Sequence, residues 1–234
     1  MPSGYSFRPR AWAVALAAAV CAAGIALGNW QARRAEEKRS LGVQLAQAMR
    51  ASPIEIGAPA SAPDSVVMKR VVAQGSFVGE RTVFLDNKLR RGRPGYEVVT
   101  PLRLNGTHVL VNRGWVPAGR TREVLPAVPT PRGEVRVEGI ALSRLPRALE
   151  PQRGAGGKVR QNLDIAAFEQ ETGLALQPIV IEQHSAAPDG LVRDWPRADA
   201  GVEKHEAYAL QWYSLAALAV GLFLVLSFRR VGAP

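Results

Sequence analysis

The sequence predicts a membrane-anchored α+β protein, in which two transmembrane helices form a hairpin around a mainly antiparallel, β-barrel-like domain with one short helix. Three features of the 234 residues support this prediction: an uncharged segment at 11–28, a second one at 208–228, and a middle region of short strands separated by Gly and Pro. All 20 acidic residues lie between Glu36 and Glu206. The net charge of +10 therefore averages over two apolar ends and a polar middle.

The first transmembrane helix is predicted at residues 11–29. Its uncharged part would span about 27 Å as a helix, close to the thickness of a bilayer's hydrocarbon core. Trp12 and Trp30 bracket it, as aromatic residues do at membrane interfaces. A cleaved signal peptide would have a shorter apolar region, and lipidation of Cys21 is disfavoured because the β-branched Val20 precedes it. We therefore expect an uncleaved anchor.

The second transmembrane helix is predicted at residues 207–228, where the uncharged segment would span about 31 Å. Two spans place the short terminal segments 1–10 and 229–234 on one side of the membrane and residues 30–206 on the other. Basic residues flank both ends of both spans. The positive-inside rule therefore does not select the side.

Two further helical features are predicted between the spans. Residues 30–50 contain good helix formers and no Pro, so the first helix is expected to continue beyond the membrane until Ser52-Pro53 stops it. Residues 51–65, rich in Pro, Ala and Ser, predict an irregular linker. A short helix is predicted from Asp164 as its N-cap to Gly173 as its C-terminal stop.

Seven segments rich in Val, Leu and Ile predict the strands. They are residues 66–77, 82–87, 96–104, 107–116, 134–142, 158–163 and 176–183. Asn105-Gly106 predicts a hairpin with a type I′ turn, which requires positive φ at both residues. Long polar connections are predicted at 117–133, 143–157 and 184–203.

The sequence carries no catalytic signature. One cysteine excludes an intrachain disulfide, and three histidines with that single cysteine disfavour a zinc site. Asp86, Glu97 and Asp164 could act as acid or base groups, but no partner accompanies them in the sequence and charged surface positions are the simpler interpretation. We therefore expect no enzyme, with a membrane-anchored enzyme of unrecognised site as an alternative.

The densest basic cluster, Lys88, Arg90, Arg91 and Arg93, is expected on a turn between two strands. A nucleic-acid site would call for interleaved aromatic residues, which are missing there. A solvated turn, near lipid headgroups or an acidic partner surface, is the favoured interpretation.

The strand that follows the predicted hairpin turn places Val109, Val111, Arg113 and Trp115 on one face by alternation. Arg113 would then meet the core, where a guanidinium must be paired and hydrogen-bonded. A structural salt bridge or loop clamp is favoured over ligand binding, and Trp115 is expected to pack.

His205, Tyr208 and Trp212 fall at i, i+3 and i+7, on one face of a helix that begins near residue 204. One interpretation is an interfacial belt of amphipathic side chains. The other is an axial ligand for haem iron with aromatic rings beside it. The spacing alone leaves both open.

Several motifs together resemble the Surfeit locus protein 1 family, whose members help to assemble cytochrome c oxidase. They are Gly28-Asn29-Trp30-Gln31 with Arg34 and Lys38, Pro94-Gly95-Tyr96-Glu97-Val98-Val99-Thr100-Pro101-Leu102, Val109-Leu110-Val111-Asn112-Arg113-Gly114-Trp115-Val116-Pro117, and His205, Tyr208-Ala209 and Gln211-Trp212-Tyr213. Residues 51–65, 117–133 and 143–157 show little that matches.

The resemblance implies the topology and the site. Both termini would be cytoplasmic and the middle domain extracytoplasmic, in the periplasm. Haem a would bind with His205 as iron ligand, Tyr208 and Trp212 as pocket residues, and Trp30 and Gln31 as the facing wall. Tyr96, Asn112, Arg113 and Trp115 are candidates for structural or partner-binding roles.

The resemblance also implies a function and partners. An assembly factor would hold haem a at the membrane boundary and assist its insertion into cytochrome c oxidase subunit I, with haem a synthase and membrane lipid as further partners and no nucleic acid. Only residues 1–10 precede the first span, so no mitochondrial presequence is expected. A bacterial inner membrane is therefore the expected location. A haem-independent scaffold that stabilises a nascent oxidase subunit is the alternative.

Overall fold

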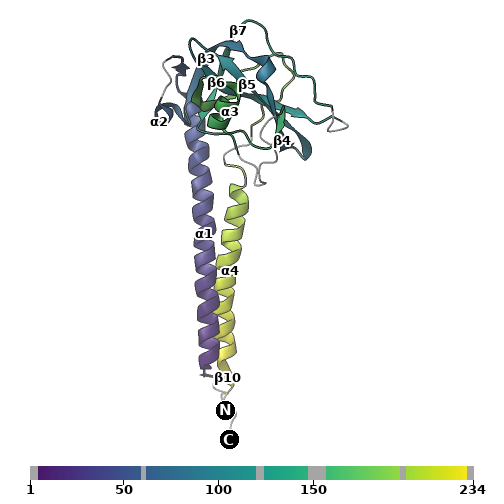
Figure 1. The fold of residues 1–234 in the computed structure, drawn as a ribbon. Helices are drawn as coiled ribbons and strands as arrows, with labels where there is room; N and C mark the ends of the chain where they lie inside the picture. Colours follow the sequence, from purple (N-terminus) through teal and green to yellow (C-terminus); the bar gives the residue numbers. More distant parts are fainter. Residues whose placement is uncertain (1–4, 59–61, 120–123, 147–156, 196–198, 231–234) are drawn as a thin grey trace. The chain divides into compact units, whose positions relative to one another are not determined.

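A computed structural model describes residues 5–58, 62–119, 124–146, 157–195 and 199–230 (Figure 1). The chain divides into two compact units. A helical unit comprises Met1–Val43 and Pro196–Pro234, and a β domain comprises Gln44–Trp195.

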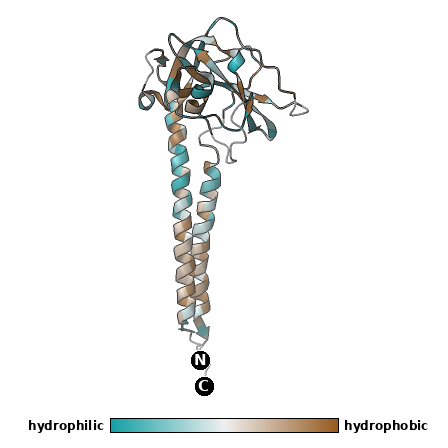
Figure 2. Ribbon diagram, in the orientation of Figure 1, coloured by the Kyte–Doolittle hydropathy of each residue, from teal (hydrophilic) through white to brown (hydrophobic). Residues whose placement is uncertain are grey.

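Two long helices, α1 (Ala11–Arg50) and α4 (Val202–Ser227), dominate the helical unit. Both are long and apolar enough to cross a membrane. One unbroken helix covers the first predicted span and its predicted extension. Helix α4 begins at Val202, close to the start expected near residue 204, and includes most of the predicted span 207–228. In Figure 2 the N-terminal half of α1 and the C-terminal part of α4 are predominantly apolar, and hydrophilic residues follow on α1.

Small residues allow α1 and α4 to pack closely. Gly24 and Gly28 of α1 are buried and lie one helical turn apart. A Cβ atom at Gly24 would lie 2.9 Å from the Cβ of Ala216 and 2.9 Å from the backbone oxygen of Trp212. A Cβ atom at Gly28 would lie 2.4 Å from the ring of Tyr213. Two small residues at this spacing are a common basis for close helix association in membranes.

The two ends of the chain pair with each other within the helical unit. Strands β1 (Tyr5–Phe7) and β10 (Phe228–Arg230) form an antiparallel ribbon in which Phe7 is opposite Phe228. The ring of Phe7 also stacks edge-on against Phe223 at a centroid distance of 6.3 Å. The sequence did not predict this ribbon, because three residues are too few to show a strand pattern.

The β domain is built on a mixed sheet that closes into a barrel. Its strands are β2 (Ile54–Ile56), β3 (Arg70–Phe77), β4 (Val83–Arg90), β5 (Arg93–Arg103), β6 (His108–Pro117), β7 (Glu134–Leu142), β8 (Val159–Arg160) and β9 (Leu176–Gln183). Their order is β2-β3-β7-β9-β6-β5-β4-β8, and β3 also pairs with β5. This last pairing closes a ring of β3, β7, β9, β6 and β5. The predicted fold class is confirmed: most pairs are antiparallel, and β2–β3, β4–β8 and β6–β9 are parallel.

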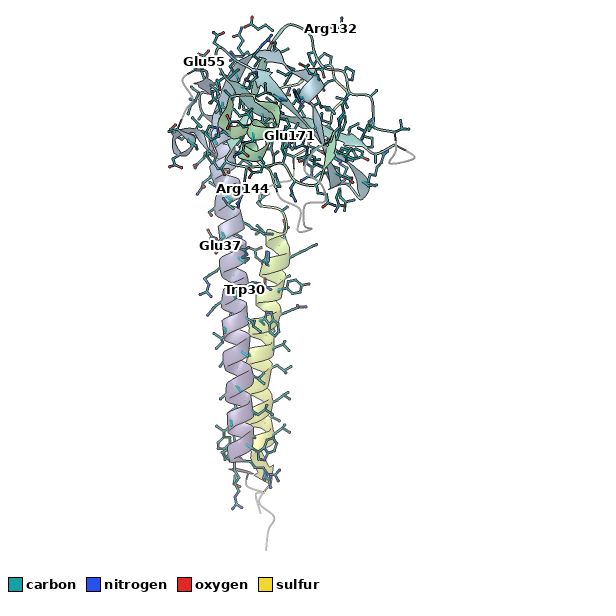
Figure 3. All side chains as sticks on the ribbon, viewed as in Figure 1. Trp30, Glu37, Glu55, Arg132, Arg144 and Glu171 are labelled. Atoms are coloured by element: carbon teal, nitrogen blue, oxygen red, sulfur yellow. The ribbon has the colours of Figure 1, made fainter. Side chains whose placement is uncertain are left out.

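Three apolar clusters lie in the described part of the domain, the third around Phe84 and Tyr96. The first draws on inward-facing residues of the ring strands, among them Val71, Leu102 and Ile181. The second packs Phe168 of helix α3 (Ile165–Thr172) against Leu110. The predicted short helix is therefore present, with Asp164 Oδ1 accepting the N–H of Ala167 at 3.1 Å and Gly173 in the left-handed region at a φ of 68°. Glu171 of α3, labelled in Figure 3, accepts two hydrogen bonds from Arg160 of β8.

Some predicted boundaries were wrong. The linker at 51–65 contains β2 and the short helix α2 (Pro63–Val66). The strand predicted from residue 66 begins at Arg70, after a turn in which Met68 has a φ of 60°. The predicted strand 158–163 is reduced to the two residues of β8. A 3-10 turn, η1 (Gly79–Arg81), joins β3 and β4.

The hairpin turns also differ from the prediction. Asn105-Gly106 does connect β5 and β6, but only Gly106 has a positive φ, so the turn is not type I′. Positive φ at both central residues occurs instead at Arg91-Gly92, between β4 and β5. Residues 120–123 and 147–156 of the predicted long connections lie outside the described part of the chain.

Gly24→Leu is expected to lower the free energy of unfolding by about 1–3 kcal/mol, because the new side chain overlaps a backbone oxygen that cannot move aside. Thermal unfolding in detergent, followed by circular dichroism, measures the change. Gly221→Leu on α4 is the matched control, since a Cβ atom there meets nothing within 4 Å. Equal melting temperatures for the two variants would show that Gly24 is not a contact point.

Candidate functional site

His205 lies in the first turn of α4, and its ring contacts α1. Its Nδ1 is 2.6 Å from Oε1 of Gln31. An amide oxygen only accepts hydrogen bonds, so this contact places the ring proton of a neutral imidazole on Nδ1. The Nε2 atom then carries the lone pair, and no described residue forms a hydrogen bond with it. The side chain is half-buried, which leaves it accessible from one side of the helix pair.

Tyr208 and Trp212 line a shallow apolar groove on α4 of about 620 Å³, together with Leu215 and Leu218. His205 is not among the lining residues of that groove. Tyr208 is 51% exposed and so does not fill the space between the helices. Helical spacing places Tyr208 and Trp212 near the His205 face of α4. Leu210, Ser214 and Leu218 of the groove lie on the other side of the helix, so the two aromatic residues form the edge of the groove that is nearest to the imidazole.

Trp30 of α1, labelled in Figure 3, is 51% exposed. No aromatic contact or hydrogen bond of its side chain occurs among the described residues. Of the two α1 residues expected to face the second helix, only Gln31 therefore contacts His205 in this structure.

Ion pairs surround the helix pair just beyond the histidine. Arg39 binds both Glu36 of α1 and Glu206 of α4, and these hydrogen bonds raise the pKa of Arg39. Arg34 pairs with Glu37 at 2.6 Å. At this end of the helical unit, Arg34 and Arg39 therefore have carboxylate partners within the unit.

In the β domain, Glu97 of β5 is buried and is not the surface charge that the sequence suggested. Its carboxylate accepts from Nη2 of Arg90 at 2.8 Å and from Nδ2 of Asn112 at 3.1 Å, and Nζ of Lys88 lies 3.8 Å away. The side chains of Lys88 and Arg90 are only 13% and 12% exposed. Both residues belong to β4, so the interpretation of this cluster as a solvated turn was wrong for them and holds for Arg91 and Arg93, which are exposed.

Arg113 is fully buried at a β-bulge in β6. Val98 is opposite Gly114 and Val99 is opposite Asn112, which leaves Arg113 outside the regular ladder. The simple alternation predicted from Val109 to Trp115 is therefore interrupted.

Tyr96, opposite Val116, packs edge-on against Phe84 at a ring-centroid distance of 6.0 Å.

The guanidinium of Arg113 is held by several acceptors. It donates to Oδ2 of Asp189 at 3.0 Å, to the backbone oxygen of Pro129 at 2.6 Å and to Oγ1 of Thr130 at 3.3 Å. Burial lowers the pKa of Arg113, and the hydrogen bond and charge of Asp189 oppose this effect. Of the two alternatives for Arg113, the structure shows the ion-paired loop clamp.

The segment Asp189–Trp195, which we call the strap, is the last described part of the β domain before the chain continues to α4. Trp115 exchanges two backbone hydrogen bonds of 2.8 Å with Val192 of the strap, and its Nε1 donates to the backbone oxygen of Lys88. Further contacts join Asp189 to Arg113 and Arg193, Asp194 to Arg91, and Trp195 to Gln183 and Arg90. The Asn112-Arg113-Gly114-Trp115 motif therefore fastens the strap to the barrel.

Sequence reasoning missed the partners in this network, namely Asp189, Arg193 and Trp195. They lie in a segment without periodicity, and their partners are distant in the chain. A local sequence signal could not have identified them.

Asp189→Ala is expected to destabilise the protein by about 3–5 kcal/mol, because two arginines would lose their shared carboxylate, and one of them is fully buried. Chemical denaturation of the full chain measures this loss. Asp64→Ala is the control, since Asp64 is exposed and makes no interaction among the described residues. A change below about 1 kcal/mol for Asp189→Ala would contradict the clamp.

Sequence comparisons with known proteins match most of this chain to one family. The model of the SURF1 family matches residues 17–217. A SURF1-like protein of Monosiga brevicollis is 27% identical over 223 residues, which cover 88% of this chain and 83% of that protein. Surfeit locus protein 1 of Mus musculus is 27% identical, covering 89% and 74% of the two chains, and that of Takifugu rubripes is 26% identical, covering 82% and 87%. The chain belongs to the SURF1 family, whose members are assembly factors for cytochrome oxidase and generally not enzymes.

Proposed function

We propose that this chain binds haem a at the membrane boundary through His205 and assists its insertion into cytochrome c oxidase subunit I. The observation that carries the proposal is the hydrogen bond from Nδ1 of His205 to Gln31. A histidine that ligates iron through Nε2 commonly donates its other N–H to a fixed acceptor, which sets the tautomer and the ring orientation. This chain supplies that arrangement without a metal.

The neighbouring residues fit the chemistry of a haem. Tyr208 and Trp212, at the edge of the groove on α4, offer aromatic and apolar surface near the His205 face of the helix. Lys204 is exposed, lies four residues before Tyr208, and provides a positive charge for a propionate at the polar end of the groove. Bound haem a would supply the iron that Nε2 ligates; the chain's own residues orient the ring and provide the wall.

The same proposal places the protein in a bacterial inner membrane with both termini in the cytoplasm and the β domain in the periplasm. The pairing of β1 with β10 supports the placement of both termini on the same side of the membrane. Oxidase subunit I would be the recipient of haem a, and haem a synthase its source. Family membership supports the oxidase assembly role.

His205→Ala is expected to abolish most of the haem a bound by the full-length protein, because the iron loses its protein ligand. The visible absorption spectrum of protein purified from cells that synthesise haem a measures the bound haem. His108→Ala is the matched control, since His108 lies on β6 in the β domain.

An unchanged spectrum for His205→Ala would contradict the ligand assignment. If the haem-free variant still supported normal oxidase assembly, the haem-independent scaffold would be the better description of the function.

Gln31→Leu is expected to weaken haem binding by roughly 10–100-fold while retaining the His205 ligand, as the loss of an outer hydrogen-bond partner does at other metal sites. Nitrogen-15 NMR of labelled histidine in the haem-free protein gives a second readout. The wild type should show the Nδ1–H tautomer at His205 and the variant a mixture.

Gln44→Leu is the control for this experiment, because Gln44 is an exposed residue of the same helix. The same tautomer in wild type and in Gln31→Leu would show that Gln31 does not set the ring's protonation.

A further inference from the structure

The opposite end of the helical unit contains a second groove, of about 460 Å³, between α1 and α4. Its walls are apolar and come from both helices, with Leu16 and Val20 on α1 and Leu222, Phe223 and Leu226 on α4. It opens next to the β1–β10 ribbon, where Ser227 and Arg229 also line it. This groove plays no part in the haem site proposed above.

Three arginines line the ribbon end of the groove: Arg8, Arg10 and Arg229. The ribbon fixes two of them, since the N–H of Arg8 donates to the backbone oxygen of Ser227 at 2.8 Å and Arg229 is opposite Ser6 in the β1–β10 pair. The β1–β10 ribbon therefore places the arginines at the open end of the apolar groove.

Within the described part of the helical unit, no Asp or Glu side chain pairs with these arginines. The first acidic residue of the chain, Glu36, is about 39 Å from Arg10 along the axis of α1, and the last, Glu206, is about 31 Å from Ser227 along α4. Among the described residues, none forms an ion pair with Arg8, Arg10 or Arg229. The three guanidinium groups are therefore available to an anion supplied from outside.

We propose that this groove binds an anionic phospholipid, with its phosphate at Arg8, Arg10 and Arg229 and an acyl chain along the apolar walls. The combination of an apolar channel with a cationic rim matches the two halves of such a lipid. Because α1 and α4 are long and apolar enough to cross a membrane, the groove is presented to lipid tails. Acyl chains fill its apolar space, where water would find no hydrogen-bonding partners.

The test compares lipid retention by the full chain purified in uncharged detergent. Native mass spectrometry counts molecules of phosphatidylglycerol or phosphatidylcholine that remain bound. The wild type should retain phosphatidylglycerol preferentially. The variant Arg8→Gln/Arg10→Gln/Arg229→Gln should lose affinity by roughly fivefold per arginine, on the order of a hundredfold in all.

The control carries the same change in charge elsewhere: Arg33→Gln/Arg50→Gln/Arg136→Gln alters three exposed arginines that lie outside the groove. It should retain phosphatidylglycerol like the wild type. Circular dichroism verifies that both variants are folded.

Three results would overturn the proposal. They are equal retention of the two lipids by the wild type, equal losses in the two triple variants, and displacement of phosphatidylglycerol by millimolar inorganic phosphate, which would mean that the arginines bind any phosphate and the groove contributes nothing.

Discussion

The close approach of α1 and α4 at Gly24 and Gly28 is the constraint on which the helical unit depends. Side chains at these positions would push against a backbone oxygen and an aromatic ring of α4. The hydrogen bond between Gln31 and His205 forms within one turn of Gly28 and tolerates little change in helix separation. The phenol of Tyr213 donates to Asn29 at 2.8 Å and fixes the same register. The packing of small residues thus sets the helix separation at which Gln31 and His205 come into contact.

The β domain depends on a different kind of contact, in which buried charges fix a unique arrangement. Taking Arg113, Asp189 and Glu97 out of water is unfavourable unless every charge has partners. The planar guanidinium of Arg113 reaches an acid, a carbonyl and a hydroxyl at once, which the single ammonium of a lysine cannot match in geometry. A shifted strap would separate Asp189 from the buried guanidinium of Arg113. The network therefore specifies where the chain leaves the barrel, even if apolar side chains in its place would give equal stability.

The sequence revealed features set by local pattern and missed those set by register between distant segments. The charge-free spans, β7, β9 and the capped helix α3 could be predicted, because each shows its period or its caps within one segment. Arg90 looked solvated because Glu97 lies across a hairpin from it. Helical spacing placed His205 on one face with Tyr208 and Trp212. Its contact with Gln31, 174 residues away, depends on the axial register between α1 and α4. The pattern of a single helix does not encode that register.

Charge pairing distinguishes the two ends of the helix pair, although basic residues occur at both. Near His205 two arginines have acidic partners: Arg34 with Glu37, and Arg39 with Glu36 and Glu206. At the ribbon end, no residue that the structure describes forms an ion pair with Arg8 or Arg229. The positive-inside rule counts Lys and Arg and largely ignores Asp and Glu, so it does not register this difference. Anion binding depends on the summed field, which falls off within about 10 Å in salt. An anionic headgroup is therefore attracted to the ribbon end, whereas at the other end the carboxylates cancel much of the field and leave recognition to the imidazole and its aromatic neighbours.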